Sequence, residues 1–412
     1  MTIAPVNVSR VQRRTVRILC GAQVLGGVGV AVGVAVGALL LEDLTGVATL
    51  AGVGQSAAVV GGALLAIPVV RVTNVHGRRG GLALAYLAGI AGAAGIVAAL
   101  YLRSAPLAFV GMFLVGGGTA ANLQARYAAV DLAAPERRGR QLSVVVWATT
   151  VGAVAGPSLA PLADDALQGA GGPRYAGPFA ATAVGFALAT ALLWMFLRPD
   201  PLLLARSESQ TPTTTKRPGV AAGWRIVRAN PGARVGVASV ALGHLVMVAV
   251  MAMTPIHIKH GMDDLDAVST VVGVVLSLHI AGMYALAPVA GWAADRFGQR
   301  RVVLAGIAIL VAACAVAGTA GHDHTLLTVG LFLLGLGWSC TMVAGSAMLT
   351  AAVEVEERPA VQGLSDLAMG LAGAGAGALS GFVVDVASYP TLTLLAALAV
   401  LPVTLTVLRS GR

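Results

Sequence analysis

The stretch GWAADRFGQRR at positions 291–301 decides how the rest of the chain is interpreted. It forms a short charged turn between two apolar runs of membrane-spanning length, 267–290 and 302–320. Three of its residues are arginines, and arginine-rich loops stay on the cytoplasmic side of a bilayer. The stretch therefore predicts two membrane-crossing helices joined by a cytoplasmic loop, and it sets the direction of every other span.

The composition points to an integral membrane protein. Of 412 residues, 57% are hydrophobic and 11% charged, which is too apolar for one soluble globule. The net charge of +9 is scattered through short loops, so no nucleic-acid partner is expected. The three cysteines lack metal-ligand spacing, and neither a Walker motif nor a nucleophile with its base is present. We therefore expect no metal, no cofactor and no enzymatic activity.

Apolar runs of about 20 residues, the length that crosses the hydrocarbon of a bilayer, occur twelve times. Helices are expected because unpaired backbone groups are costly in lipid. The fold class is an all-α membrane protein with twelve transmembrane helices, at 18–41, 47–70, 81–102, 107–127, 141–163, 178–197, 233–257, 267–290, 302–320, 326–350, 363–386 and 391–408.

The positive charges are distributed unequally between the two sides of the membrane. With the N-terminus inside, all 27 Lys and Arg residues except Arg103, Arg174 and Lys259 fall on the inner side. This asymmetry predicts a multi-pass protein of the plasma (inner) membrane with both termini cytoplasmic.

A polar segment at 198–230 divides the chain into two related halves, 1–197 and 231–412. The middle of the segment, SESQTPTTTKRPG, has the composition of a linker, and a short interfacial helix or a basic anchor is expected at 224–228.

The two halves also share sequence patterns. FLVGGG at 113–118 recurs as FLLGLG at 332–337, an offset of 219. NVHG at 74–77 aligns with DRFG at 295–298, an offset of 221. These offsets predict a duplicated six-helix unit.

The charged turn resembles the loop signature of the major facilitator superfamily of secondary transporters. The matching residues are Gly291, Asp295, Arg296, Gly298, Arg300 and Arg301. The resemblance implies two pseudo-symmetric halves that alternate around a midplane cavity. It also implies a cytoplasmic latch, in which Asp295 lies near the N-terminal end of span 5 or span 11.

The first-half counterpart of this loop departs from the family pattern. It consists of Asn74, Gly77 and Arg78, with Asn74 where the family has Asp. We hypothesise that Asp366 in span 11 supplies the missing carboxylate to Arg71, Arg78 or Arg79. The alternative is that Asp366 is stabilised by its own helix N-terminus.

Span 5 carries a second resemblance, to the drug:proton antiporter branch of the superfamily. Gly152, Gly156 and Pro157 match its signature, while Ala160 and Pro161 replace the usual last pair. The glycines permit close helix approach and the proline bends the helix, although generic packing would explain them too. The coupling arginine that many relatives carry in span 4 is absent here.

Two histidines are candidates for proton coupling. His244 is central in span 7 and His279 in span 8, and ionisable groups deep in a membrane are costly enough to suggest function. Histidine exchanges protons near neutral pH, so they form a proton-responsive pair, contact substrate, or simply hydrogen-bond across helices. Glu42 and Asp43 at the outer end of span 1 take up protons or are solvated loop charges.

The resemblance also suggests which residues line the cavity. By position in the first and fourth helices of each half they are Gln23, Asn122, Gln124, His244, Trp338, Ser339 and Thr341. This sparse polarity suits a lipophilic or weakly cationic solute. The sequence thus predicts a monomeric, proton-coupled exporter of small lipophilic compounds. The alternative is proton-coupled uptake of a small metabolite.

Overall fold

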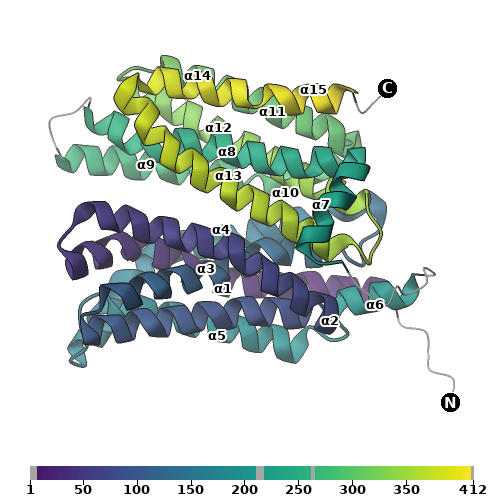
Figure 1. Ribbon diagram of the computed structural model, residues 1–412, viewed down its shortest axis with the longest axis horizontal. Coiled ribbons are helices and arrows are strands. Elements are labelled where there is room, and N and C mark those ends of the chain that lie inside the picture. Colours follow the sequence, from purple (N-terminus) through teal and green to yellow (C-terminus); the bar gives the residue numbers. More distant parts are fainter. Residues whose placement is uncertain (1–6, 210–217, 261–264, 410–412) are drawn as a thin grey trace. The chain divides into compact units, whose positions relative to one another are not determined.

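The computed structural model describes residues 7–209, 218–260 and 265–409, and this part of the chain is helical without strands (Figure 1). The centre of the expected linker, 210–217, lies outside the described residues. The helices are α1 (Val8–Thr45), α2 (Ala48–Leu102), α3 (Ala105–Ala128), a 3₁₀ turn (Pro135–Arg137), α4 (Arg138–Gly169), α5 (Ala176–Phe196), α6 (Pro201–Glu208), α7 (Val220–Ala229), α8 (Pro231–His260), α9 (Leu265–Tyr284), α10 (Ala287–Phe297), α11 (Gln299–Thr319), α12 (His324–Ala351), α13 (Arg358–Val386), α14 (Tyr389–Ala399) and α15 (Leu401–Arg409).

The helices account for the twelve expected spans. Within the described ranges, nine helices are long and apolar enough to cross a membrane, and a bent pair in α4 brings the number to ten. One of the nine, in α2, contains two expected spans, because the backbone at Gly77 leaves the helical region at φ 77° and ψ −172°. The last expected span corresponds to the consecutive short helices α14 and α15.

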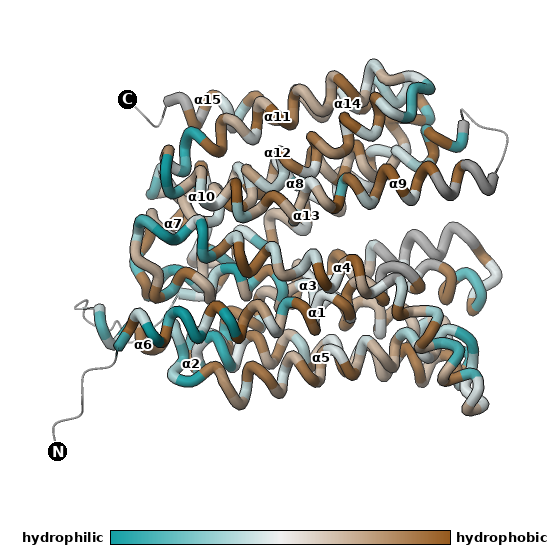
Figure 2. The backbone as a smooth tube through the Cα atoms, turned by 180° about the vertical axis from the view of Figure 1, so that it is seen from behind, coloured by the Kyte–Doolittle hydropathy of each residue, from teal (hydrophilic) through white to brown (hydrophobic). Residues whose placement is uncertain are grey.

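The expected polar segment between the halves contains two short helices. Asp200 starts α6 because its Oδ1 accepts from the backbone N–H groups of Leu202 and Leu203, at 3.0 and 3.2 Å. Helix α7 covers the region where the sequence suggested an interfacial helix or an anchor. Figure 2 shows hydrophilic residues gathered in α6 and α7, whereas the long helices are largely hydrophobic.

The chain forms two compact units, each of which takes a short piece from the other end of the sequence. The first unit comprises 1–135, 144–223 and 354–363, and the second comprises 136–143, 224–353 and 364–412. The start of α13 thus packs with the first unit and the start of α4 with the second. The division into halves at 1–197 and 231–412 remains a proposal.

Small residues allow the helices of the first unit to pack closely. The buried Phe186 of α5 lies against glycines of three other helices, Gly29 of α1, Gly89 of α2 and Gly118 of α3. A Cβ atom at Gly118 would lie 2.2 Å from the Phe186 ring. Membrane helices associate largely through such van der Waals packing at small residues.

In the second unit, α12 is the central helix and contacts α8, α9, α10 and α11. Large apolar side chains remain exposed on the outer helices, among them Phe382 at 65% and Leu394 at 60%. Such exposure is expected of helices that face lipid rather than water.

Candidate functional site

A polar cluster in the first unit joins four helices. Gln23 of α1 donates through Nε2 to the backbone oxygen of Asn122 at 3.3 Å and to Thr149 Oγ1 of α4 at 3.1 Å. Tyr86 of α2 donates to Asn122 Oδ1 at 2.9 Å. The structure thus brings together Gln23 and Asn122, two of the predicted cavity residues, and adds Tyr86 and Thr149, which the sequence analysis had not selected.

A second cluster, in the second unit, contains a titratable side chain. Trp338 Nε1 of α12 donates to His244 Nδ1 of α8 at 3.1 Å. The ring of Tyr284 meets Trp338 edge-on, with centroids 5.6 Å apart and planes at 78°. Gly373 of α13 packs on the imidazole, and a Cβ there would lie 2.8 Å from His244 Nε2. His244 and Trp338, both predicted, are therefore direct partners within this His244–Trp338–Tyr284 cluster.

The other predicted residues of α12 lie in helix contacts. Thr341 donates to the backbone oxygens of Gly337 and Trp338, at 3.1 and 3.0 Å, and packs against Gly243 and Gly306. Ser339 is fully buried. Each therefore packs within the helices of its own unit.

His279 occupies a different environment from His244. It is completely buried in α9, and its Nδ1 lies 2.8 Å from the backbone oxygen of Leu331 in α12. Leu331 and Trp338 are seven residues apart on α12, so the hydrogen-bond partners of the two histidines are separated by about 10 Å along that helix. The two histidines thus contact α12 at separate levels.

The loop at 74–79 is held by a buried ion pair. Arg78 donates through Nε to Asp131 Oδ2 at 2.7 Å and through Nη2 to Asp131 Oδ1 at 3.1 Å. Its guanidinium also donates to Gln124 Oε1 at 3.3 Å and to Gln362 Oε1 at 2.6 Å. Arg358 adds a bond from Nη1 to the backbone oxygen of Asp131, at 3.3 Å.

This network bears on two expectations. The carboxylate that pairs with Arg78 is Asp131, in the turn after α3, and not Asp366. A pairing of Asp366 with Arg71 or Arg79 stays a prediction. Asp366 is buried in α13, at 3% exposure. Gln124 accepts from Arg78, and its expected place in the cavity lining stays a prediction. The sequence shows Asp131 only as an acidic residue shortly after span 4. It does not show that this carboxylate pairs with Arg78, because the two residues are far apart along the chain.

The linker helix α6 contributes to the same loop. Arg206 is buried and donates to Asn74 through two atoms, to the backbone oxygen at 3.1 Å and to Oδ1 at 3.2 Å. Asn74 Nδ2 in turn donates to the backbone oxygen of Pro218 at 3.0 Å. Asp200 Oδ2 accepts from the backbone N–H of Arg79 at 2.8 Å. Linker residues thus bind the loop at the position where the sequence departs from the family pattern.

The second-half loop contacts the start of α4. Asp295 accepts from the backbone N–H groups of Gly139 and Arg140, both at 2.8 Å, in the first turn of α4. The contact lies at the N-terminal end of span 5, one of the two places expected for the Asp295 carboxylate. A helix N-terminus carries a partial positive charge. Gly291 permits the approach, because a Cβ there would lie 2.4 Å from the backbone oxygen of Gly139.

The remaining loop residues have simpler surroundings. Gly298 has φ 90°, a backbone conformation that favours glycine. Arg296 and Arg301 are exposed, and Arg300 is half-buried. Glu42 and Asp43 are exposed near the end of α1.

Helix α4 shows the geometry that its glycines and proline suggested. A Cβ at Gly152 would lie 2.6 Å from the backbone of Gly27 in α1, and one at Gly156 would lie 2.6 Å from Ala31 Cβ. The helix bends by 48° between Gly156 and Ser158, at the position of Pro157. The packing is therefore tight and the bend real, whichever function they serve.

Comparison with known proteins assigns the class. The protein family described as Major Facilitator Superfamily matches this chain over residues 18–271 and 258–410. The fold resembles solved transporters of low sequence identity. One is the proton:xylose symporter XylE, with a TM-score of 0.71 at 16% identity over 95% of each chain. Another is a bacterial homologue of the iron transporter ferroportin, with a TM-score of 0.74 at 15% identity over 97% of this chain and 100% of that one.

The chain belongs to the major facilitator superfamily, and it is a multi-pass secondary transporter rather than an enzyme. Among its relatives, the uncharacterized MFS-type transporter YdeG of Bacillus subtilis is 36% identical over 95% of this chain and 90% of its own. The riboflavin transporter RfnT of Brucella anthropi is 28% identical over 87% and 85%.

Proposed function

We propose that the protein exports small lipophilic compounds in exchange for protons, acting as a monomer in the plasma membrane with both termini in the cytoplasm. Its membership in the superfamily supports secondary transport, and the resemblance of α4 to the antiporter signature supports export. The observation that carries the proposal is the hydrogen bond between Trp338 and His244.

This hydrogen bond depends on the protonation state of His244. The indole N–H of Trp338 can only donate, so His244 Nδ1 must be an acceptor and the neutral ring carries its hydrogen on Nε2. A proton added to Nδ1 turns it into a donor, and the two groups then repel. Proton uptake therefore releases the indole from the imidazole and changes the surface that faces the substrate.

The same cluster suits a lipophilic or aromatic solute. The ring of Trp338 lies 6.2 Å from that of His244 and 5.6 Å from that of Tyr284, measured between centroids. Aromatic walls with one or two polar groups are typical of sites for small organic ligands. The substrate would contact Trp338 and His244, and its binding would depend on the same bond that the proton breaks.

The two loop networks would act as latches of the transport cycle. Asp295 would hold the start of α4 through two charge-assisted hydrogen bonds. The Arg78–Asp131 pair and the Arg206–Asn74 contact would hold the first-half loop. Alternation requires such contacts to break and re-form, so their strength would set the rate of the cycle.

The test is flux in proteoliposomes with an imposed pH gradient, using a lipophilic cationic dye as the probe. Export predicts that dye moves against the proton flow. His244→Gln is expected to abolish proton-driven accumulation while substrate exchange at equal pH persists. Trp338→Phe, which keeps a ring but loses the donor, is expected to weaken the coupling, and Trp224→Phe on the exposed face of α7 serves as its control.

Uptake of a small metabolite is the second candidate. The 28% identity to the riboflavin transporter RfnT over most of both chains favours it, and a flavin is a flat ring system that could stack on Trp338. Labelled riboflavin in the same vesicles separates the candidates. Riboflavin movement in the direction of the proton flow supports uptake, and dye movement against the proton flow supports export.

A further inference from the structure

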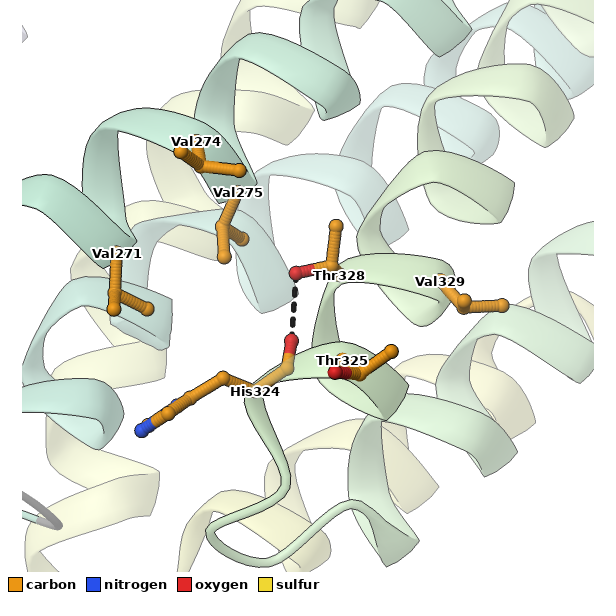
Figure 3. Close-up of a pocket in the computed structure, with 7 residues that line it drawn as sticks. All are labelled: Val271, Val274, Val275, His324, Thr325, Thr328 and Val329. Atoms are coloured by element: carbon orange, nitrogen blue, oxygen red, sulfur yellow. Dashed lines mark hydrogen bonds between the residues drawn. The ribbon is translucent and has the colours of Figure 1, made fainter.

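A groove with a volume of about 350 Å³ lies between α9 and α12 in the second unit (Figure 3). Figure 3 shows the valines of α9 on one side and the residues of α12 on the other. Its lining residues are Val271, Val274, Val275, His324, Thr325, Thr328 and Val329. Thr328 donates its hydroxyl to the backbone oxygen of His324 at 2.6 Å, so the groove is largely apolar apart from His324 and Thr325 at the start of α12.

The fully buried His279 lies one helical turn beyond this groove. It follows Val275 by four residues on α9, which places both on the same face about 6 Å apart along the axis. Its partner Leu331 follows Thr328 by three residues on α12, so both helices continue from the groove to the histidine. Val275, which lines the groove, is only 1% exposed and is the groove residue nearest to His279 along α9.

His279 has an acceptor atom whose hydrogen-bonding capacity is unused. The backbone oxygen of Leu331 can only accept, so His279 Nδ1 carries the hydrogen and Nε2 is the free acceptor of the neutral ring. Nε2 is buried and has no hydrogen-bond partner among the described residues. An unsatisfied buried acceptor is costly, and a proton or a water molecule would satisfy it.

The helices close together on the other side of His279. A Cβ at Gly335 of α12 would lie 2.3 Å from the backbone oxygen of His279 and 2.8 Å from the nitrogen of Met283. The two backbones are thus in contact on the side of His279 away from the groove, which favours an approach to the ring from the groove.

We propose that His279 is a proton-binding site reached through the groove between α9 and α12, with Val275 as the barrier that controls access. A hydronium ion gives its proton to the lone pair of Nε2, an N–H bond forms, an O–H bond breaks, and water is released. The Nδ1–H bond to Leu331 is kept throughout. The role of this site in coupling rests on the proposed function.

The groove opens on the side opposite to the arginine-rich loop. Helix α11 separates that loop from the turn before His324, and its 21 residues span about 30 Å, the thickness of a bilayer core. The site would therefore take its proton from the outer face. Among the described side chains, the titratable ones on α9 and on α8 and α12, which pack against it, are Tyr284, Arg234, His244, His257, Lys259, His324 and Cys340.

Nitrogen NMR of the reconstituted, histidine-labelled protein tests the site directly, with His279→Gln assigning the signals. In alkaline buffer we expect the tautomer with the hydrogen on Nδ1, and in acidic buffer the doubly protonated ring. Val275→Phe should slow proton exchange at Nε2 on the order of tenfold, equal to a barrier of about 1.4 kcal/mol. Val275→Ala should accelerate it.

Val311→Phe on an exposed face of α11 is the matched control for added bulk and should leave exchange unchanged. Hydrogen on Nε2 in alkaline buffer would overturn the proposal. So would an equal effect of Val275→Phe and Val311→Phe.

The outcome is separable from that of the proposed function. If the wild-type protein couples dye export to protons while His279 never titrates, only this site is refuted. If His279 titrates through the groove but flux ignores the pH gradient, the coupled transport is refuted and the proton site stands.

Discussion

The buried ion pair between Arg78 and Asp131 predicts that Asp131→Asn destabilises the first unit strongly. The two side chains are 1% and 0% exposed, and both carboxylate oxygens accept from the guanidinium. The substitution leaves the positive charge buried without a counter-charge, and breaking a buried pair costs about 3–5 kcal/mol. Gln124 and Gln362 still accept from Arg78, so we expect the lower end of that range.

The assay is thermal unfolding of the purified protein in detergent, followed by tryptophan fluorescence. With about 2–4 °C per kcal/mol for a unit of this size, a loss of about 3 kcal/mol lowers the transition by roughly 6–12 °C. The double variant Arg78→Gln with Asp131→Asn removes both charges and should recover part of the loss, because two neutral amides can bond to each other. Arg301→Gln, at an exposed position, should shift stability by less than about 0.5 kcal/mol.

Two results would refute this reasoning. Asp131→Asn could unfold at the wild-type temperature, which would mean that the charge is not buried in the membrane-embedded protein. Alternatively, the double variant could lose the sum of the two single losses, which would mean that the side chains are not energetically coupled.

Three further predictions concern the loops. Gly291→Val should lower both flux and unfolding temperature, because a Cβ there would lie 2.4 Å from a backbone oxygen of α4, whereas Gly375→Ala, at an open position, should be tolerated in the same assays. Arg206→Ala removes two hydrogen bonds from a buried guanidinium and should cost about 2–4 kcal/mol in thermal unfolding, against little change for the exposed Arg225→Ala. Asp295→Asn removes the charge at the start of α4 and should cost about 0.3–1 kcal/mol, with altered flux in vesicles as the clearer readout and unchanged flux as the contrary result.

Much of the fold could be predicted from the sequence, because the free energy of inserting a segment into a membrane is a nearly additive property of consecutive residues. The apolar runs gave the spans, and the break at Gly77 within α2 falls between the expected spans 47–70 and 81–102. The loop at 291–301 pointed to the superfamily because the backbone conformation and the charges of a short turn depend on the residues of the turn itself. Gly298, for example, needs a positive φ angle.

The candidate site was less predictable. The sequence analysis selected His244 because an imidazole deep in a membrane is costly, and it selected Trp338 by its position in span 10. The structure shows that the two side chains share a hydrogen bond. Gln124 was expected to line the cavity, which stays a prediction, and its bond from Arg78 was not foreseen. Such partners are hard to predict because a small error in the orientation of a helix moves a side chain from one neighbour to another.

The order of apolar and charged residues was enough to show that this chain crosses the membrane repeatedly, and its loop motifs and relatives place it among secondary transporters. Only the packed structure shows that Asp131 pairs with Arg78, that Arg206 of the linker binds Asn74, and that the Nε2 of His279 has no partner among the described residues. The physical reason is the distance along the chain. Membrane insertion depends on the hydropathy of consecutive residues, whereas these contacts join residues up to 132 positions apart and form only when the helices have packed.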